Sequence, residues 1–270
     1  MRSLRFRGSF YPYEKEEIES FIKENLKKIK IEDKAKLAIV PHAGYIYSGF
    51  CALHSYANLD KEVKRVIIFG VDHNGLCNKI CVGKEDWEGI FGKIETDKEF
   101  IEKISKFENV EINDEIHKYE HSIEVQIPFL EYFLKNFKLV PILINNMSFE
   151  EIYDFSKNLS NLLDNETALI FSGDLIHHGE IYGFVIFTEK RIEKVRNADM
   201  HIINSILKLN EKEFLELLEF YPTVCGKYTF QAFISFCKIL NKKPKLLCYY
   251  NSGEITKEED VIVGYSSIIA

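Results

Sequence analysis

The chain has 270 residues, of which 46% are hydrophobic and 29% are charged, and its formal net charge is −7. This composition is typical of a folded globular protein and excludes a disordered or fibrous one. Because the net charge is negative, we expect no nucleic-acid partner.

No apolar run reaches the roughly 18 residues that span a bilayer. The basic start of the chain is followed by acidic residues and not by the apolar segment of a secretory signal. We therefore expect a cytoplasmic protein that makes no membrane contact. The six cysteines (51, 77, 81, 225, 237 and 248) are irregularly spaced, so we expect buried thiols and not a disulfide framework.

Short apolar, β-branched runs alternate with helical patterns along the chain. The runs predict strands at 37–40, 66–69, 80–82, 139–144, 168–171, 246–250 and 261–265. Ser148 and Glu151 form a capping box that predicts a helix towards Leu163. Further helices are predicted at 188–208 and 227–240.

Strands that alternate with helices indicate an α/β fold. No linker divides the chain, so we expect one domain over residues 1–270, with a mostly parallel central sheet flanked by helices. The last two predicted strands are joined by a short charged turn, and we expect them to form an antiparallel edge.

Three of the predicted strands end in polar residues. His42 follows 37–40, His73 follows 66–69, and both Asp174 and His177 follow 168–171. Ligands bind at the carboxyl ends of the strands in open α/β sheets. A single histidine at a strand end is more often structural, but three such ends favour a common site if the strands are parallel neighbours.

Two other segments carry candidate site residues. His121 and Glu124 would share a face if they lie on a helix; the alternative is a solvated first turn. Cys225 precedes the predicted helix at 227–240, whose N-terminus would lower the thiol pKa. Spacing alone favours the alternative that Cys225 is a buried cap residue.

Two imidazoles with a thiolate or a carboxylate make a three-ligand metal site with an open position. Without a metal, the same residues would provide a nucleophilic cysteine with a histidine base. The chain has no GxSxG, P-loop, GxGxxG or HExxH motif, which disfavours serine hydrolases, NTPases, dinucleotide enzymes and zincins.

The chain resembles the Memo family, whose prokaryotic members are called AmmeMemoRadiSam system protein B. The resemblance rests on five segments: 5–12 (RFRGSFYP), 41–49 (PHAGYIYSG), 120–124 (EHSIE), 172–179 (SGDLIHHG) and 225–227 (CGK). The family is similar in fold to class III extradiol (LigB-type) dioxygenases. In those enzymes two histidines and a glutamate bind Fe(II), and in Memo-like proteins a cysteine replaces the carboxylate.

The resemblance also implies roles for individual residues. His42, His73 and Cys225 match the metal positions. His177 matches the histidine that acts as acid or base, Asp174 the nearby carboxylate, and His121 a further pocket histidine, so these three are the catalytic candidates. Tyr47 matches a tyrosine of the peptide-binding pocket, and Lys227 lies where arginine is common and would accept an anion there.

These roles favour a metal-dependent oxidoreductase that acts on a small molecule, with iron(II) as the first expected cofactor and copper as the second. One alternative is a scaffold without catalysis that binds a phosphopeptide or a partner protein in the same pocket. The family's name also implies a functional link to a radical-SAM protein. Another alternative is a zinc hydrolase with the same three ligands.

Overall fold

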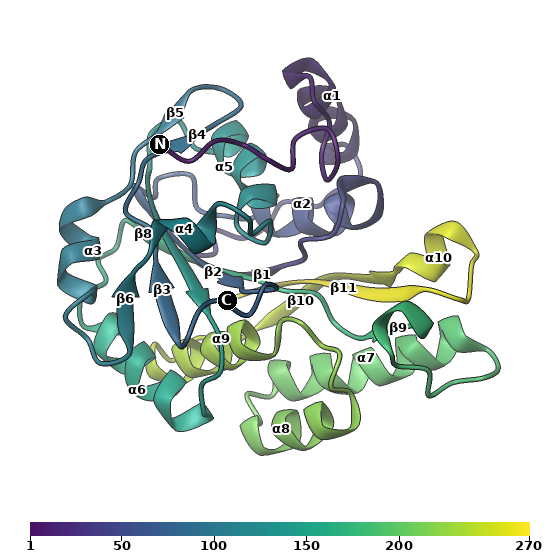
Figure 1. The fold of residues 1–270 in the computed structure, drawn as a ribbon. Helices are drawn as coiled ribbons and strands as arrows, with labels where there is room; N and C mark the ends of the chain where they lie inside the picture. Colours follow the sequence, from purple (N-terminus) through teal and green to yellow (C-terminus); the bar gives the residue numbers. More distant parts are fainter.

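The computed structural model describes residues 1–270, and one mixed sheet of nine strands runs through it (Figure 1). The strands of this sheet are β1 (Leu37–Val40), β2 (Arg65–Val71), β3 (Ile80–Val82), β6 (Val110–Ile112), β7 (Lys138–Ile144), β8 (Thr167–Ser172), β9 (His177–His178), β10 (Lys245–Asn251) and β11 (Ile262–Ile269). A separate small sheet holds β4 (Trp87–Glu88) and β5 (Lys93–Ile94). The α/β class expected from the sequence is confirmed.

The strand order is β10-β11-β1-β8-β2-β7-β3-β6, and β9 pairs with β11 beside this path. The central strands β1, β8, β2 and β7 are parallel neighbours, with Val40 opposite Ser172 and Phe69 opposite Phe171. The carboxyl ends of β1, β8 and β2 therefore meet at one edge, as the sequence predicted. The antiparallel edge is also confirmed, because β10 and β11 pair antiparallel and β10 lies outermost.

Helices cover both faces of the sheet (Figure 1). The helices are α1 (Lys15–Leu26), α2 (Phe50–Ala57), α3 (Lys98–Ile104), α4 (Asp114–His117), α5 (Ile127–Phe133), α6 (Phe149–Ser160), α7 (Arg191–Leu207), α8 (Glu211–Phe220), α9 (Lys227–Ile239) and α10 (Ser252–Thr256). Three short elements complete the set: the π-helix η1 (Tyr45–Gly49) and the 3₁₀-helices η2 (Glu124–Gln126) and η3 (Glu180–Tyr182).

Alternation along the strands divides the core into two layers, because successive side chains point to opposite faces. Leu37 and Ile39 of β1 pack with residues of α6, α7 and α9. Ala38 and Val40 of the same strand pack with residues of α1, α2 and α5. Burial on both faces explains why the central strands are apolar throughout.

The capping box predicted ahead of α6 is present. The Ser148 side chain accepts a hydrogen bond from the backbone N–H of Glu151 at 3.2 Å, and the Glu151 carboxylate accepts one from the Ser148 N–H at 2.9 Å. None of the helices combines the length and the apolar composition that crossing a bilayer requires.

Candidate functional site

A cavity of about 450 Å³ lies at the carboxyl ends of β1, β2 and β8. All four residues expected there from the strand ends line it: His42, His73, Asp174 and His177. His121 joins them from the segment before η2. Aromatic and apolar side chains also line the cavity, from Phe10, Tyr47, Tyr182, Val261, Val263 and Tyr265, beside the polar Ser252, Thr256 and Glu258.

His42 is buried, with 1% of its surface exposed, and its tautomer follows from its neighbours. Its Nδ1 lies 2.9 Å from the Ser172 Oγ, which itself donates to the Ser122 carbonyl at 2.7 Å. Since the Ser172 hydroxyl hydrogen is used in this way, Nδ1 of His42 is the donor and Nε2 keeps its lone pair. Burial and the neighbouring histidines lower the pKa of His42 well below its usual value, so the ring is neutral.

Cys225 lies next to this lone pair. Its Sγ is 3.3 Å from the His42 Nε2 and 3.1 Å from the backbone nitrogen of Asp174, which donates to it. Gly173 and Gly226 make this approach feasible, because a Cβ on Gly173 would lie 2.5 Å from the Gly226 Cα.

Two effects act in opposite directions on the pKa of the Cys225 thiol. Burial raises the pKa of Cys225 well above its usual value. The start of α9 at Lys227 was expected to lower it. Desolvation of the charged form outweighs the helix dipole here, so the thiol is neutral unless a bound cation favours the thiolate.

A buried carboxylate holds His73 in place. Glu120, 1% exposed, accepts from the backbone N–H of His73 at 2.8 Å, and its other oxygen lies 2.9 Å from the His73 Nδ1. Burial opposes the charged ring, but the bond and the charge of Glu120 raise the pKa of His73 above its usual value. The contact leaves Nε2 of His73 directed away from Glu120.

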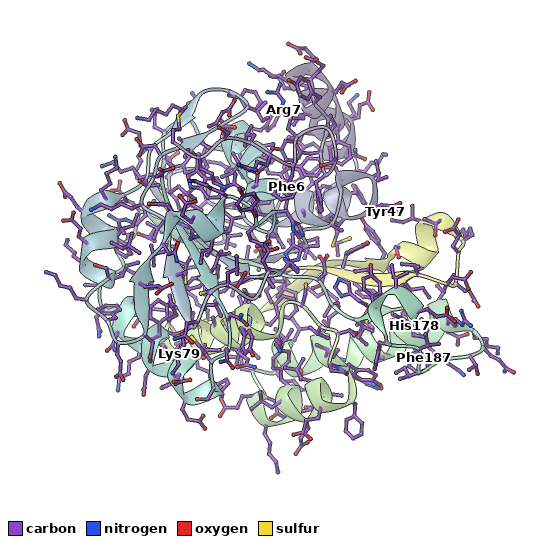
Figure 2. All side chains as sticks on the ribbon, viewed as in Figure 1. Phe6, Arg7, Tyr47, Lys79, His178 and Phe187 are labelled. Atoms are coloured by element: carbon purple, nitrogen blue, oxygen red, sulfur yellow. The ribbon has the colours of Figure 1, made fainter.

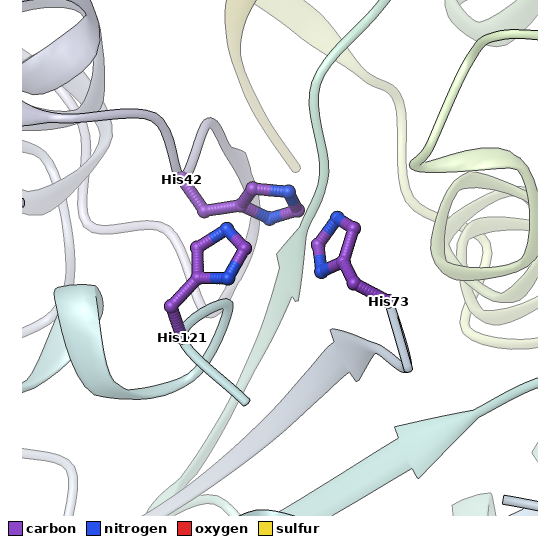
Figure 3. A group of neighbouring side chains, drawn as sticks. All are labelled: His42, His73 and His121. Carbon is purple, nitrogen blue, oxygen red and sulfur yellow. The ribbon is translucent and has the colours of Figure 1, made fainter. Parts of the chain in front are cut away.

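The three histidines lie against one another, as Figure 3 shows for His42, His73 and His121. The ring centroids of His42 and His73 are 5.0 Å apart, and those of His73 and His121 are 4.5 Å apart and stacked. Burial lowers the pKa of His121 to about 4, so this ring is neutral at pH 7.

His121 and Glu124 neither share a helix face nor form the solvated first turn that was the alternative. His121 precedes η2, whereas Glu124 begins it and is completely buried away from the cavity. Glu124 forms an ion pair with Arg2 at 2.7 Å and accepts from the backbone N–H groups of Arg5 and Phe6. Its role is to fasten the N-terminal segment.

Arg2 and Glu120 are the positioning residues that sequence analysis missed. Arg2 is 2% exposed and donates to the carbonyls of His117 at 2.7 Å and of Glu120 at 2.9 Å. The guanidinium therefore connects the start of the chain to the segment that orients His73. A charged residue near a chain start is ordinarily solvated, so no pattern in the sequence points to this role.

Asp174 and His177 follow β8 on opposite sides of a short loop. The Asp174 Oδ1 accepts from the backbone N–H of His42 at 2.9 Å, and burial raises the pKa of Asp174 to about 7. The His177 Nδ1 lies 3.0 Å from the Leu175 carbonyl and 2.9 Å from the Thr223 carbonyl. Because carbonyls only accept, Nδ1 carries the hydrogen and Nε2 keeps the lone pair.

Tyr47 and Lys227 were also predicted to lie in the pocket, and only Tyr47 does. Tyr47 is 39% exposed and lines the cavity (Figure 2). Lys227 does not line it, and its Nζ lies 4.6 Å from the centre of the Tyr228 ring. His178, next to His177 in the chain, is buried and stacks on Phe187 outside the cavity.

The structure brings metal-ligating atoms together in two groups that share His42. The first group holds His42, His73 and His121, the second holds His42, Asp174 and Cys225, and the ligand atoms of each group lie within 4.8 Å of one another. Neutral imidazole nitrogens, a thiol and a carboxylate suit iron, copper or zinc better than magnesium or calcium. The donor set therefore fits the kind of metal expected from the sequence.

Comparison with known proteins gives matches over the whole length. The chain is 33% identical to a MEMO1 family protein of Methanosarcina mazei, covering 100% of this chain and 98% of the relative. It is 35% identical to one of Pyrococcus horikoshii, with 97% and 96% covered, and 34% identical to one of Aquifex aeolicus, with 100% and 98% covered.

A solved structure of an uncharacterized protein from Escherichia coli matches with a TM-score of 0.56 at 10% identity, over 88% of this chain and 100% of that one. At this identity the match concerns the fold alone. The model of the Memo family, described as Memo-like protein, matches residues 2–269. The chain therefore belongs to the Memo family of proteins.

Proposed function

We propose that this protein is a metal-dependent oxidoreductase that acts on a small organic molecule in the cavity at the carboxyl ends of β1, β2 and β8. The observation that carries the proposal is the 3.3 Å contact between the His42 Nε2 and the Cys225 Sγ, beside His73 and His121. A histidine with a purely structural role does not require other metal-ligating side chains around its ring. The neutral His42 ring lies in two groups of them.

His42, Cys225 and His73 are the proposed ligands. Cys225 and His73 belong to different groups that share His42, with Asp174 beside Cys225 and His121 beside His73 as further donors. Iron is the first proposed metal and copper the second, because thiolate and imidazole suit both. When bound, such a metal supplies redox chemistry and an open position for dioxygen or substrate. The free thiols of all six cysteines support a place in the reducing cytoplasm.

The chain's own residues provide proton transfer. Burial lowers the pKa of His177 to about 4, so its ring is neutral at pH 7 and its bare Nε2 accepts a proton from the substrate. Asp174, with its pKa near 7, exchanges protons close to neutrality. His177 is thus proposed as the base, while an acid role at pH 7 would first require the ring to gain a proton.

The cavity lining favours a neutral or cationic molecule of limited size. No lysine or arginine lines it, and its acidic groups are Asp174 and Glu258. Phosphate recognition depends on arginine or lysine donors, so the lining favours a small substrate over a phosphorylated peptide. The functional link to a radical-SAM protein stays a prediction.

The first test is the metal content of anaerobically purified protein, measured by elemental mass spectrometry. We expect near-stoichiometric iron or copper in the wild type and its loss in both His42→Ala and Cys225→Ala. His201→Ala, on the exposed surface of α7, is the matched control and keeps the metal. Zinc alone would favour hydrolysis, and failure of added Fe(II), Cu(I) and Zn(II) to bind would contradict a metal enzyme.

The second test separates catalysis from metal binding. His177→Asn should keep its metal and lose roughly 10²–10⁴-fold in the rate of dioxygen consumption with a substrate found by screening, since a positioned base contributes that much. Equal rates for wild type and variant would remove His177 from the mechanism while leaving the metal site intact.

A further inference from the structure

Two cysteines outside the cavity lie together where α2 packs on the C-terminal strands. Cys51 belongs to α2 and Cys248 to β10. The Cys51 Sγ lies 3.8 Å from the Cys248 carbonyl oxygen, and both residues pack with Val263 and Tyr265 of β11. Val263 and Tyr265 also line the cavity, so the pair lies directly behind one of its walls.

His54 completes this cluster from one turn further along α2. Its Nδ1 lies 2.9 Å from the Phe50 carbonyl and therefore carries the ring hydrogen in the neutral form. The neighbouring Cys51 thiol and the His54 side chain lower the pKa of Cys248 below its usual value, although burial opposes this. For Cys51 the effect of burial dominates and raises the pKa of its thiol well above the usual value.

The difference in exposure between the two cysteines also favours Cys248 as the one that reacts first. Cys248 is partly exposed, whereas Cys51 is completely buried. A reagent in solvent therefore reaches the more acidic sulfur first. The ionisable groups around the pair are His54 of α2, Tyr250 of β10 and, at longer range, Asp174.

We propose that Cys51 and Cys248 form a redox-active pair in which Cys248 reacts with a peroxide and Cys51 then closes a disulfide. The Cys248 thiolate attacks one oxygen of hydrogen peroxide, the O–O bond breaks, and hydroxide leaves with a proton from the His54 imidazolium as water. Cys248 is thereby oxidised to a sulfenic acid and the peroxide is reduced.

In the second step the Cys51 sulfur attacks the sulfenic sulfur. The S–S bond forms, the S–O bond breaks, and the hydroxide leaves with the Cys51 proton as a second water. One peroxide and two thiols thus give one disulfide and two waters. Because the two residues already pack in one cluster, with the Cys51 Sγ 3.8 Å from the Cys248 carbonyl oxygen, closure to the S–S length of about 2.05 Å requires a local side-chain movement.

A second pair of thiols in the chain provides an internal comparison. Cys77 and Cys81 are also neighbours, but both are buried, and the Cys81 Sγ lies 3.0 Å from the Glu111 carboxylate. The neighbouring Cys77, together with burial and Glu111, raises the pKa of Cys81 far above its usual value. This pair should stay reduced under conditions that close Cys51–Cys248.

The experiment treats the reduced full-length chain with a small excess of hydrogen peroxide and maps cysteine-containing peptides by mass spectrometry. We expect a Cys51–Cys248 linked peptide and unlinked Cys77 and Cys81. In Cys51→Ala, the Cys248 sulfenic acid should accumulate and be trapped by dimedone. Cys248→Ser should give neither product. Absence of the linked peptide in the wild type, or equal linkage of Cys77 to Cys81, would overturn the proposal.

The role of His54 has its own readout. His54→Gln should slow alkylation of Cys248 by iodoacetamide about fivefold at pH 6. His54 lowers the pKa of Cys248, and the larger thiolate fraction that results outweighs the lower nucleophilicity of that thiolate. Most of this difference should disappear at pH 9. Thermal unfolding of each variant checks that the fold is kept, and an unchanged rate at pH 6 in a folded variant would remove His54 from the pair.

Discussion

Glu120 holds His73 at two points, through the backbone N–H at 2.8 Å and through the ring Nδ1 at 2.9 Å. One carboxylate therefore fixes both the position and the orientation of a proposed ligand. Burial opposes its ionisation, but the bond and the charge of His73 lower the pKa of Glu120 to about 2. Glu120 is a positioning residue for the site.

Glu120→Gln should weaken metal binding about 10–100-fold, the usual effect of losing a carboxylate that orients a ligating histidine. The amide satisfies the ring Nδ1, but its NH₂ group then faces the His73 N–H, where two donors repel. Competitive metal titration measures the change. Glu115→Gln on the exposed surface of α4 is the control, and equal affinities in both variants would contradict the positioning role.

Arg2→Met should destabilise the protein by about 3–5 kcal/mol, because it leaves the buried Glu124 carboxylate without its ion-pair partner. Urea unfolding measures the free energy. Arg5→Met provides the comparison, since exposed Arg5 contributes a cation–π contact with Tyr119 that is worth at most about 1 kcal/mol. A smaller loss for Arg2→Met than for Arg5→Met would show that the pair is dispensable.

Asp199→Asn should flatten the pH dependence of stability. Asp199 is completely buried on α7, accepts from the Ile176 N–H at 3.1 Å, and pairs with the Tyr249 hydroxyl at 2.8 Å. Burial raises the pKa of Asp199 to about 8. An aspartate in the unfolded chain titrates near ~3.9, so between these values the folded state holds the extra proton.

The free energy of unfolding therefore falls as the pH rises from about 4 to 8, by up to about 1.4 kcal/mol per pH unit. Asparagine has the same shape, accepts from Ile176 and donates to Tyr249 at every pH. Urea unfolding at a series of pH values tests this. If wild type and Asp199→Asn show the same slope, Asp199 is not the group that titrates.

Phenyl phosphate and phosphotyrosine should not bind measurably to the wild-type cavity, since it contains no lysine or arginine. Glu258→Lys places a cation at the rim and should create detectable phosphate binding by calorimetry. Glu259→Lys, one residue along but not part of the lining, is the matched control. Tight phosphate binding by the wild type would instead support the phosphopeptide alternative.

Local patterns in the sequence predicted much of the fold. The strand at 80–82 has the predicted bounds, and α6, α7 and α9 begin within three residues of their predicted starts. The π-helix at Tyr45–Gly49 and the two-residue strand β9 were not predicted, because tertiary contacts stabilise such short elements and no periodicity marks them.

The candidate site was predictable in its strand-end residues and not in their supports. His42, His73 and Asp174 follow apolar runs, and parallel neighbours place such residues at one edge. Arg2 and Glu120 act through buried contacts that depend on the folded chain. For Cys225, a sequence shows the nearby helix start but not the depth of burial, which raises the pKa of the thiol.

The strand β11 comes after every proposed ligand in the chain, yet it lies between β10 and β1 and supplies Val263 and Tyr265 to the cavity wall. During synthesis the ligand residues therefore emerge before the wall that shields them. A newly made chain would expose its histidines and Cys225 to whatever metal is most abundant, until β11 inserts beside β1. For the proposed metal site, loading would then depend on timing as well as on affinity.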